Sequence, residues 1–319
     1  MIKVVNSTVQ LKKIKKLLYL IQEEWDTIQE GPVLDIMTET ADRGGKLSIY
    51  YALFYFNTLI IFMLLPLRPN IMVWLGFNEG PVDFVFPYHV DYFIDSDKYF
   101  YAIEFHIISC STVVVTVLVA VDTLLIIFVQ HACSLFSSIS YRLEHLIDEK
   151  NLYWYPVKTE DPMFAVISDC IKKHNQAIEF TKLIGATYSW SLFFGIGLNI
   201  LLMSVSGIQV INLFGDLDEM LRYVPFVVGE MSHIFIETLI SQQLMDYSLE
   251  INKSICMVNW YNLSMKSQKL LSMMFMRSRI ACTITAGNFF TMSLELFMTI
   301  MKTSASYFTL LRSVQESID

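Results

Sequence analysis

Long runs of apolar residues divide this chain, and polar stretches separate them. The runs lie at about residues 47–67, 105–129, 183–212, 223–245 and 280–312. Each is long enough to cross a bilayer as a helix, which takes about 20 mostly apolar residues. The fourth run is the least apolar, because it contains Glu230, His233 and Glu237. The pattern predicts an all-α fold, a polytopic membrane bundle with five transmembrane helices.

Composition supports a membrane protein. The chain has 319 residues, of which 54% are hydrophobic, and its mean hydropathy is +0.46. Only 17% of its residues are charged, whereas soluble domains carry about 25%. The formal net charge of -8 argues against nucleic acid as a partner, because nucleic-acid-binding surfaces are basic.

Lysine and arginine are distributed unevenly between the polar stretches. Seven precede the first run, six lie between the second and third, and five lie between the fourth and fifth, which makes eighteen on one side. The other side has four. Because cytoplasmic loops carry the excess of these residues, we expect a cytoplasmic N-terminus and, after five crossings, an extracellular C-terminus.

This orientation assigns each part of the chain to a side of the membrane. We expect a cytoplasmic segment at 1–46, a transmembrane bundle at 47–246, an outer loop at 66–100, a cytoplasmic loop at 130–182, cytoplasmic anchor helices at 247–279, a final transmembrane helix at 280–312 and an extracellular tail at 313–319.

The final apolar run contains charges that a lipid-facing helix would not carry. Glu295 and Lys302 are seven residues apart, which places them two turns apart on one face. A charge inside the bilayer is costly, so each should face water, another subunit or protein. Alternatively, Lys302 extends to the membrane surface and Glu295 accepts local hydrogen bonds from Ser and Thr.

Several segments near the C-terminus resemble those of the insect odorant receptors. They are Gln242-Gln-Leu-Met-Asp-Tyr-Ser-Leu-Glu250, Trp260-Tyr261, Lys266-Ser-Gln-Lys-Leu-Leu-Ser-Met-Met-Phe-Met-Arg-Ser278 and Lys302-Thr-Ser-Ala-Ser-Tyr-Phe-Thr-Leu-Leu-Arg-Ser313. The segment from Glu23 to Lys46 is similar to the one that precedes the family's third helix. That family has seven helices, so its first two are the pair without a counterpart among the five apolar runs.

The resemblance implies a ligand-gated, non-selective cation-channel subunit in the plasma membrane. It also implies a hetero-tetramer with the olfactory co-receptor, no cofactor and no enzymatic activity. The last helix would line the pore, with a hydrophobic constriction at Leu310 beside Ser313 and Val314. A ring of leucines can close a pore by excluding water. The alternative is that Leu310 only packs against a neighbouring helix.

The ligand implied by the resemblance is a small volatile odorant, bound in the outer half of the bundle. The family's second helix contributes to that pocket, and the remaining walls correspond to the first, second and fourth apolar runs. Their outward halves combine apolar and aromatic side chains with a few hydroxyls, which suits such molecules. The candidates are Tyr55, Thr58, Leu59, Phe62, Phe105, Ile108, Ser109, Thr112, Tyr223, Phe226 and Val227.

Other interpretations have weaker support. A spacing found in metal-binding bundles occurs at Glu230, His233 and Glu237. Those bundles repeat the motif on a second helix, and this sequence does not. We therefore predict no metal site and an interior polar contact for His233. No nucleotide loop or catalytic triad order suggests an enzyme. A gustatory-type receptor and a truncated subunit that senses nothing remain alternatives.

Overall fold

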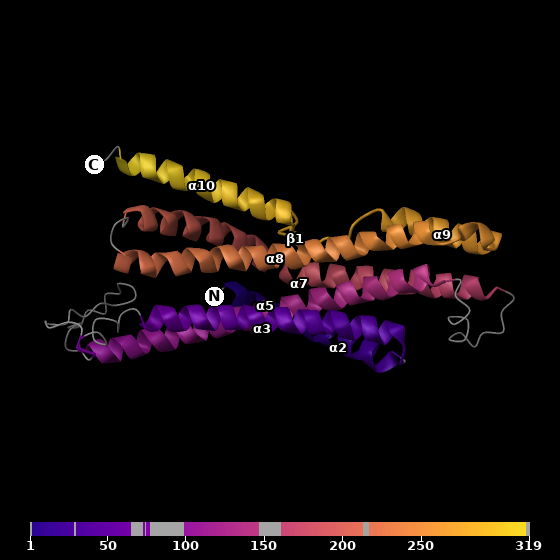
Figure 1. The fold of residues 1–319 in the computed structure, drawn as a ribbon, viewed down its shortest axis with the longest axis horizontal. Helices are drawn as coiled ribbons and strands as arrows, with labels where there is room; N and C mark the ends of the chain where they lie inside the picture. The colour runs from indigo at the N-terminus through magenta and orange to yellow at the C-terminus, as the bar shows by residue number, and fades with distance from the viewer. Residues whose placement is uncertain are drawn as a thin grey trace. The chain divides into compact units, whose positions relative to one another are not determined.

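The computed structural model describes residues 2–28, 30–64, 73, 75–76, 99–146, 161–212 and 217–316. Within these ranges the protein is almost entirely helical (Figure 1). The elements are α1 (Ile2–Val9), α2 (Leu11–Thr27), α3 (Pro32–Leu64), α5 (Phe100–Glu144), α7 (Pro162–Asn212), α8 (Leu217–Met257), the 3-10 turn η1 (Trp260–Asn262), α9 (Met265–Ser278), β1 (Thr285–Ala286), β2 (Phe290–Thr291) and α10 (Leu294–Glu316).

Four of the described helices are long and apolar enough to cross a membrane. These are α3, α5, α7 from Pro162 to Val210, and α8 from Tyr223 to Met257. They contain the first four predicted apolar runs, apart from residues 65–67, which lie outside the described residues. This confirms the helical membrane fold. The shorter α10, which has 23 residues, is not among these four helices. Its Ser, Thr and charged residues account for this difference.

The helices extend well beyond the apolar runs on the side predicted to be cytoplasmic. The segment predicted as a cytoplasmic loop at 130–182 is helical over most of its described residues, because α5 continues to Glu144 and α7 begins at Pro162. Its cytoplasmic location stays a prediction. The extension of α5 is buried on most of its sides, and its buried apolar residues include Ala132, Cys133, Phe136, Ile139 and Leu143. Packing against other parts of the protein stabilises a helix, so α5 does not end with its apolar run.

The last part of the chain also differs from the prediction. Helix α8 continues to Met257, so the predicted anchor region 247–279 contains the end of α8, then η1 and α9. The final helix begins at Leu294 rather than at residue 280. Before it, β1 and β2 form an antiparallel hairpin, in which Gly287 and Asn288 both have positive φ, 59° and 61°. Such angles end a helix and suit a tight turn.

Three predicted segments lie largely or partly outside the described residues. Most of the outer loop at 66–100 falls there, as do residues 147–160 of the predicted cytoplasmic loop and the last three residues of the tail. The first predicted segment, at 1–46, contains α1, α2 and the start of α3.

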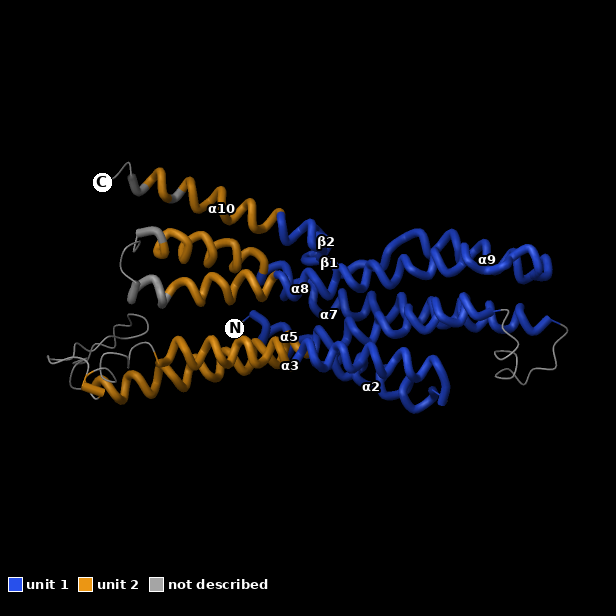
Figure 2. The backbone as a smooth tube through the Cα atoms, viewed as in Figure 1, with its two compact units in different colours: residues 1–48, 124–195, 235–298 blue, residues 49–123, 196–234, 299–319 orange. Residues whose placement is uncertain are grey.

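The chain divides into two compact units, coloured separately in Figure 2. Unit 1 comprises Met1–Ser48, Leu124–Gly195 and Phe235–Met298, and unit 2 comprises Ile49–Thr123, Ile196–Ile234 and Thr299–Asp319. Unit 1 has an apolar core that includes Leu17, Phe128, Phe136 and Ile184. Unit 2 buries polar groups among its apolar residues, and these groups define its candidate site.

Candidate functional site

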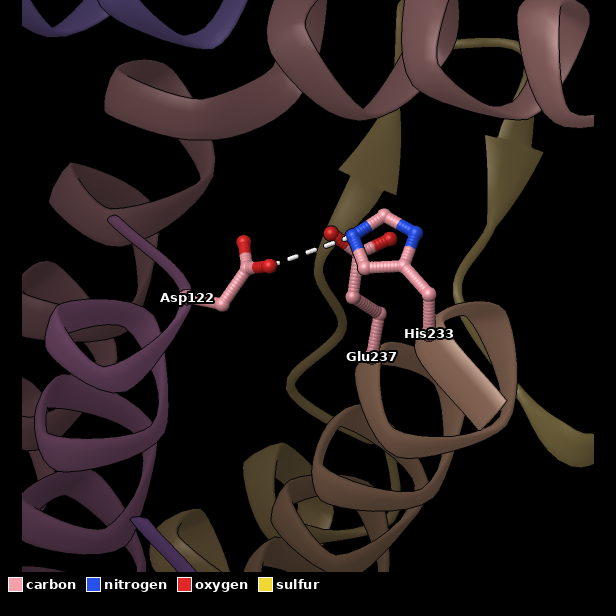
Figure 3. A group of neighbouring side chains, drawn as sticks. All are labelled: Asp122, His233 and Glu237. Atoms are coloured by element: carbon pink, nitrogen blue, oxygen red, sulfur yellow. Dashed lines mark ion pairs between the residues drawn. The ribbon is translucent and has the colours of Figure 1, made fainter. Parts of the chain in front are cut away.

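A buried polar network connects three helices within unit 2. The hydroxyl of Tyr51 on α3 donates a hydrogen bond to Asp122 Oδ2 on α5, at 2.6 Å. The same oxygen lies 3.2 Å from His233 Nε2 on α8 (Figure 3). All three residues are at most 9% exposed. Because an unpaired carboxylate would be costly in this apolar setting, the network makes the positions of α3, α5 and α8 depend on one another.

Tyr55 continues this network one helical turn along α3. Its ring centroid is 4.6 Å from that of Tyr51, and its hydroxyl donates to the carbonyl oxygen of Gly229 on α8, at 2.8 Å. Gly229 precedes His233 by one turn of α8. Two tyrosines on α3 therefore face two successive turns of α8, one directly and one through Asp122. Among the predicted ligand residues, Tyr55 is the one with a buried side chain, which is 8% exposed.

The other predicted ligand residues divide by exposure. Thr58, Leu59, Phe62, Ile108, Ser109, Tyr223 and Val227 are half-buried, whereas Phe105, Thr112 and Phe226 are exposed. Phe105 is 72% exposed, so its ring points out of the described bundle. The hydroxyls of Thr58, Ser109 and Thr112 each donate to the carbonyl four residues earlier in their own helix. Each hydroxyl oxygen can still accept a hydrogen bond from another group.

The acidic residues of α8 have separate partners. The Glu230 side chain accepts a hydrogen bond from Asn199 on α7, and Asn199 also donates to the Glu230 carbonyl at 3.2 Å. Glu237, drawn with Asp122 and His233 in Figure 3, stands one turn beyond His233 on α8. Its carboxylate pairs with Lys3 at 3.0 Å within unit 1. Glu230 and Glu237 thus have different partners, and Lys3 supplies a positive charge beside the Glu237 carboxylate.

Within unit 2, α10 packs against α7 through small residues. Ser304 is 5% exposed, and its carbonyl oxygen lies 3.4 Å from the hydroxyl of Ser204. One turn along both helices, the Phe308 ring covers Gly207, where an added Cβ would come within 3.3 Å of the ring. Small residues let helices approach closely in membranes, so this seam fixes which face of α10 is turned inward.

The opposite face of α10 is exposed in the single chain. It carries hydroxyls, two charges and apolar side chains, namely Glu295, Lys302, Ser306, Thr309, Leu310, Ser313 and Val314. Leu310 is 57% exposed. Glu295 and Lys302 thus both lie on the exposed side, as their seven-residue spacing predicts.

Residues 1–305 match the family model described as 7tm Odorant receptor. The chain belongs to this odorant receptor family. It is therefore a multi-pass membrane protein of a receptor family, and the resemblance carried by its C-terminal segments is confirmed.

Similar odorant receptors come from several insects. Odorant receptor 9a of Drosophila melanogaster is 25% identical over 62% of this chain and 48% of its own length. Odorant receptor 82a of the same species is 23% identical over 88% of this chain and 71% of its own length. The odorant receptor coreceptor of Aedes aegypti is 23% identical over 48% of this chain and 32% of its own length. The match to receptor 9a thus spans about half of that relative.

A solved structure supports the same fold. The olfactory receptor OR5 from Machilis hrabei, in complex with eugenol, superposes with a TM-score of 0.70. The superposition covers 98% of this chain and 77% of that chain, at 15% sequence identity. At this identity the likeness supports the fold of this odorant receptor and does not identify its ligand.

Sequence reasoning missed two members of the polar network of this odorant receptor. Neither Asp122 nor Tyr51 is among the candidate residues predicted from the sequence. A single carboxylate in a long apolar run requires a partner, and that signal could have marked Asp122. The partner itself is 71 residues away in the sequence, so spacing could not identify it.

Proposed function

We propose that this chain is a subunit of a ligand-gated, non-selective cation channel that detects small volatile molecules. It acts in the plasma membrane, as part of a hetero-tetramer with the olfactory co-receptor. Membership of the odorant receptor family carries this proposal. The similarity to a co-receptor and the fold shared with a receptor solved with eugenol support it.

The proposed odorant pocket lies in unit 2, between α3, α5 and α8. Its walls include Tyr55, Thr58, Leu59 and Phe62 of α3, Ile108 and Ser109 of α5, and Tyr223 and Val227 of α8. These residues are buried or half-buried and combine apolar surface with hydroxyl groups, which suits small neutral molecules. The Tyr55–Gly229 hydrogen bond holds two of these walls together, so ligand binding beside it would act on the separation of α3 and α8.

The proposed pore surface is the exposed face of α10. A face with hydroxyls and charges that is turned away from the rest of its own chain suits contact with water or with other subunits. Leu310 would form the constriction, and Ser313 and Val314 would lie at the mouth. Lys302 and Glu295 would face the inner part of the pore or a neighbouring subunit.

The test of this proposal is the substitution Leu310→Ala, with the chain co-expressed with an insect olfactory co-receptor. Shortening the constricting side chain should let water enter the closed pore and raise the current without ligand. Leu53→Ala is the matched control, because Leu53 on α3 is 53% exposed and Leu310 is 57% exposed. Whole-cell recording at equal surface expression compares the two variants.

An unchanged unliganded current in Leu310→Ala, with ligand-evoked current intact, would count against Leu310 as the constriction. A chain that reaches the surface with the co-receptor but adds no ligand-evoked current would instead favour the silent-subunit alternative.

A further inference from the structure

A hollow opens between α2, α3 and α5 within unit 1, separate from the residues proposed to bind odorant. It opens partly to solvent, and the cavity within it measures about 80 Å³. Its lining residues come from three helices and are Ile21, Trp25, Ala41, Gly44, Gly45, Ile127, Gln130, His131 and Ser134. None of these nine side chains carries a fixed charge, so an ion would lose its hydration there without compensation.

One wall of the hollow is polar and comes from a single face of α5. Ile127, Gln130, His131 and Ser134 follow the spacing of one helical face, and the three polar residues are at most 7% exposed. Gln130 Nε2 donates to Gln243 Oε1 at 2.8 Å, and Ser134 donates to the His131 carbonyl at 2.7 Å. These bonds leave the Gln130 carbonyl oxygen and the Ser134 oxygen able to accept.

His131 is the least satisfied group in this wall. Its ring meets Phe180 edge-on, with centroids 5.1 Å apart. The His131 side chain is 7% exposed. No described residue forms a hydrogen bond with its ring nitrogens, which are not among the fully enclosed side-chain atoms without a partner. A neutral imidazole has one donor and one acceptor. A ligand with a hydroxyl group could satisfy either nitrogen.

The facing wall is apolar and partly formed by glycine. Trp25 and Ile21 are one turn apart on α2 and supply an aromatic and an aliphatic surface. At Gly44 an added Cβ would lie 2.9 Å from Gln130 Cγ, which shows that α3 closely approaches α5 there. Gly45 also lines the hollow but is exposed, and an added Cβ there would meet no atom within 4 Å.

We propose that this hollow binds a small neutral molecule that consists of an apolar ring with one hydroxyl group, of the phenol class. The ring would lie against Trp25 and Ile21, and the hydroxyl would bond to His131 or Gln130. This second site belongs to unit 1, whereas the proposed odorant residues belong to unit 2. The evidence for this second site is the cavity and His131, and binding there does not require the chain to conduct ions.

The experiment measures binding of 4-fluorophenol to the full chain in lipid nanodiscs by fluorine NMR. Fluorobenzene, which has a similar ring and no hydroxyl, is the matched probe. We expect saturable binding of 4-fluorophenol and at least tenfold weaker binding of fluorobenzene. His131→Phe keeps an aromatic edge against Phe180 and should remove most of that preference.

Filling the hollow supplies the second comparison. Gly45→Leu should weaken 4-fluorophenol binding at least tenfold, and Gly45→Ala, which adds one methyl group and favours the helix, should weaken it less. Gly185→Leu is the control, because a Cβ at Gly185 on α7 also meets nothing within 4 Å but lies away from the hollow. The Gly45→Ala variant keeps the test valid if the leucine variant does not fold.

Two results would overturn the proposal. One is a signal that rises linearly with concentration and matches empty nanodiscs, which indicates partition into lipid only. The other is saturable binding that the Gly45 and His131 variants leave unchanged, which places the molecule elsewhere.

Discussion

The turn that precedes α10 leaves no room for a side chain at Gly287. Gly287 has φ of 59°, a left-handed conformation that costs a residue with a side chain about 1–2 kcal/mol. Its backbone N–H donates to the Ser189 carbonyl on α7, at 2.9 Å. A Cβ at Gly287 would lie 2.7 Å from Phe193 Cδ2 and 2.8 Å from Cγ. The turn thus fits against α7 only with glycine at this position.

The substitution Gly287→Ala combines both penalties. Overpacking of this kind typically costs about 1–3 kcal/mol, whereas the loss of glycine's freedom in the unfolded chain returns about 0.4–1 kcal/mol. We therefore expect a net destabilisation of about 1–4 kcal/mol. Phe193 also stacks near Phe290, with centroids 6.4 Å apart, so its ring has aromatic neighbours that restrict its movement away from an added methyl group.

The assay is thermal unfolding of the purified chain in detergent, followed by loss of the monodisperse gel-filtration peak. Gly185→Ala is the control and should be neutral or stabilising, because its Cβ meets nothing and alanine favours a helix. A double-mutant cycle with Phe193→Ala separates the clash from the backbone strain. If Gly287→Ala unfolds at the same temperature as Gly185→Ala, the turn does not require glycine at position 287.

Two further predictions concern buried and exposed carboxylates. Asp122→Leu should destabilise the fold by about 3–5 kcal/mol, because Tyr51 and His233 lose their shared partner, and chemical denaturation of the detergent-solubilised protein measures this. A hydrogen bond from Ser264 holds the pKa of the Asp161 carboxyl below its usual range. The stability that this interaction adds is therefore present above the unfolded pKa of about 3.9 and is lost as pH falls through the folded value. Asp161→Asn should flatten that part of the pH dependence in melting curves between neutral pH and pH 3, and an unchanged slope would assign it to other groups.

The sequence predicted the apolar helices well, because hydropathy reports which residues contact lipid. It did not predict where the helices end. Residues after the second apolar run are polar enough to suggest a loop, yet α5 continues through them and is buried there on most of its sides, with Phe136, Ile139 and Leu143 among the buried residues. Helix length beyond the bilayer depends on packing between distant segments, which a hydropathy average does not detect.

The turn before α10 could have been predicted, whereas the polar network could not. Adjacent Gly287 and Asn288 are a strong turn signal, but the apolar residues on both sides obscured it. The pairing of Asp122 with Tyr51 and His233 depends on the register of three helices. The sequence contains all three residues, but only the three-dimensional structure shows that they contact one another.

The most direct test of the proposed function is current recording from cells that express this chain with an insect olfactory co-receptor. A panel of small neutral volatile molecules is applied, and cells with the co-receptor alone provide the baseline. We predict cation currents evoked by at least one ligand that the co-receptor alone does not detect, with a ligand preference that Tyr55→Phe alters. Responses identical to those of the co-receptor alone, at confirmed surface expression of this chain, would contradict the proposal that it is an odorant-gated channel subunit.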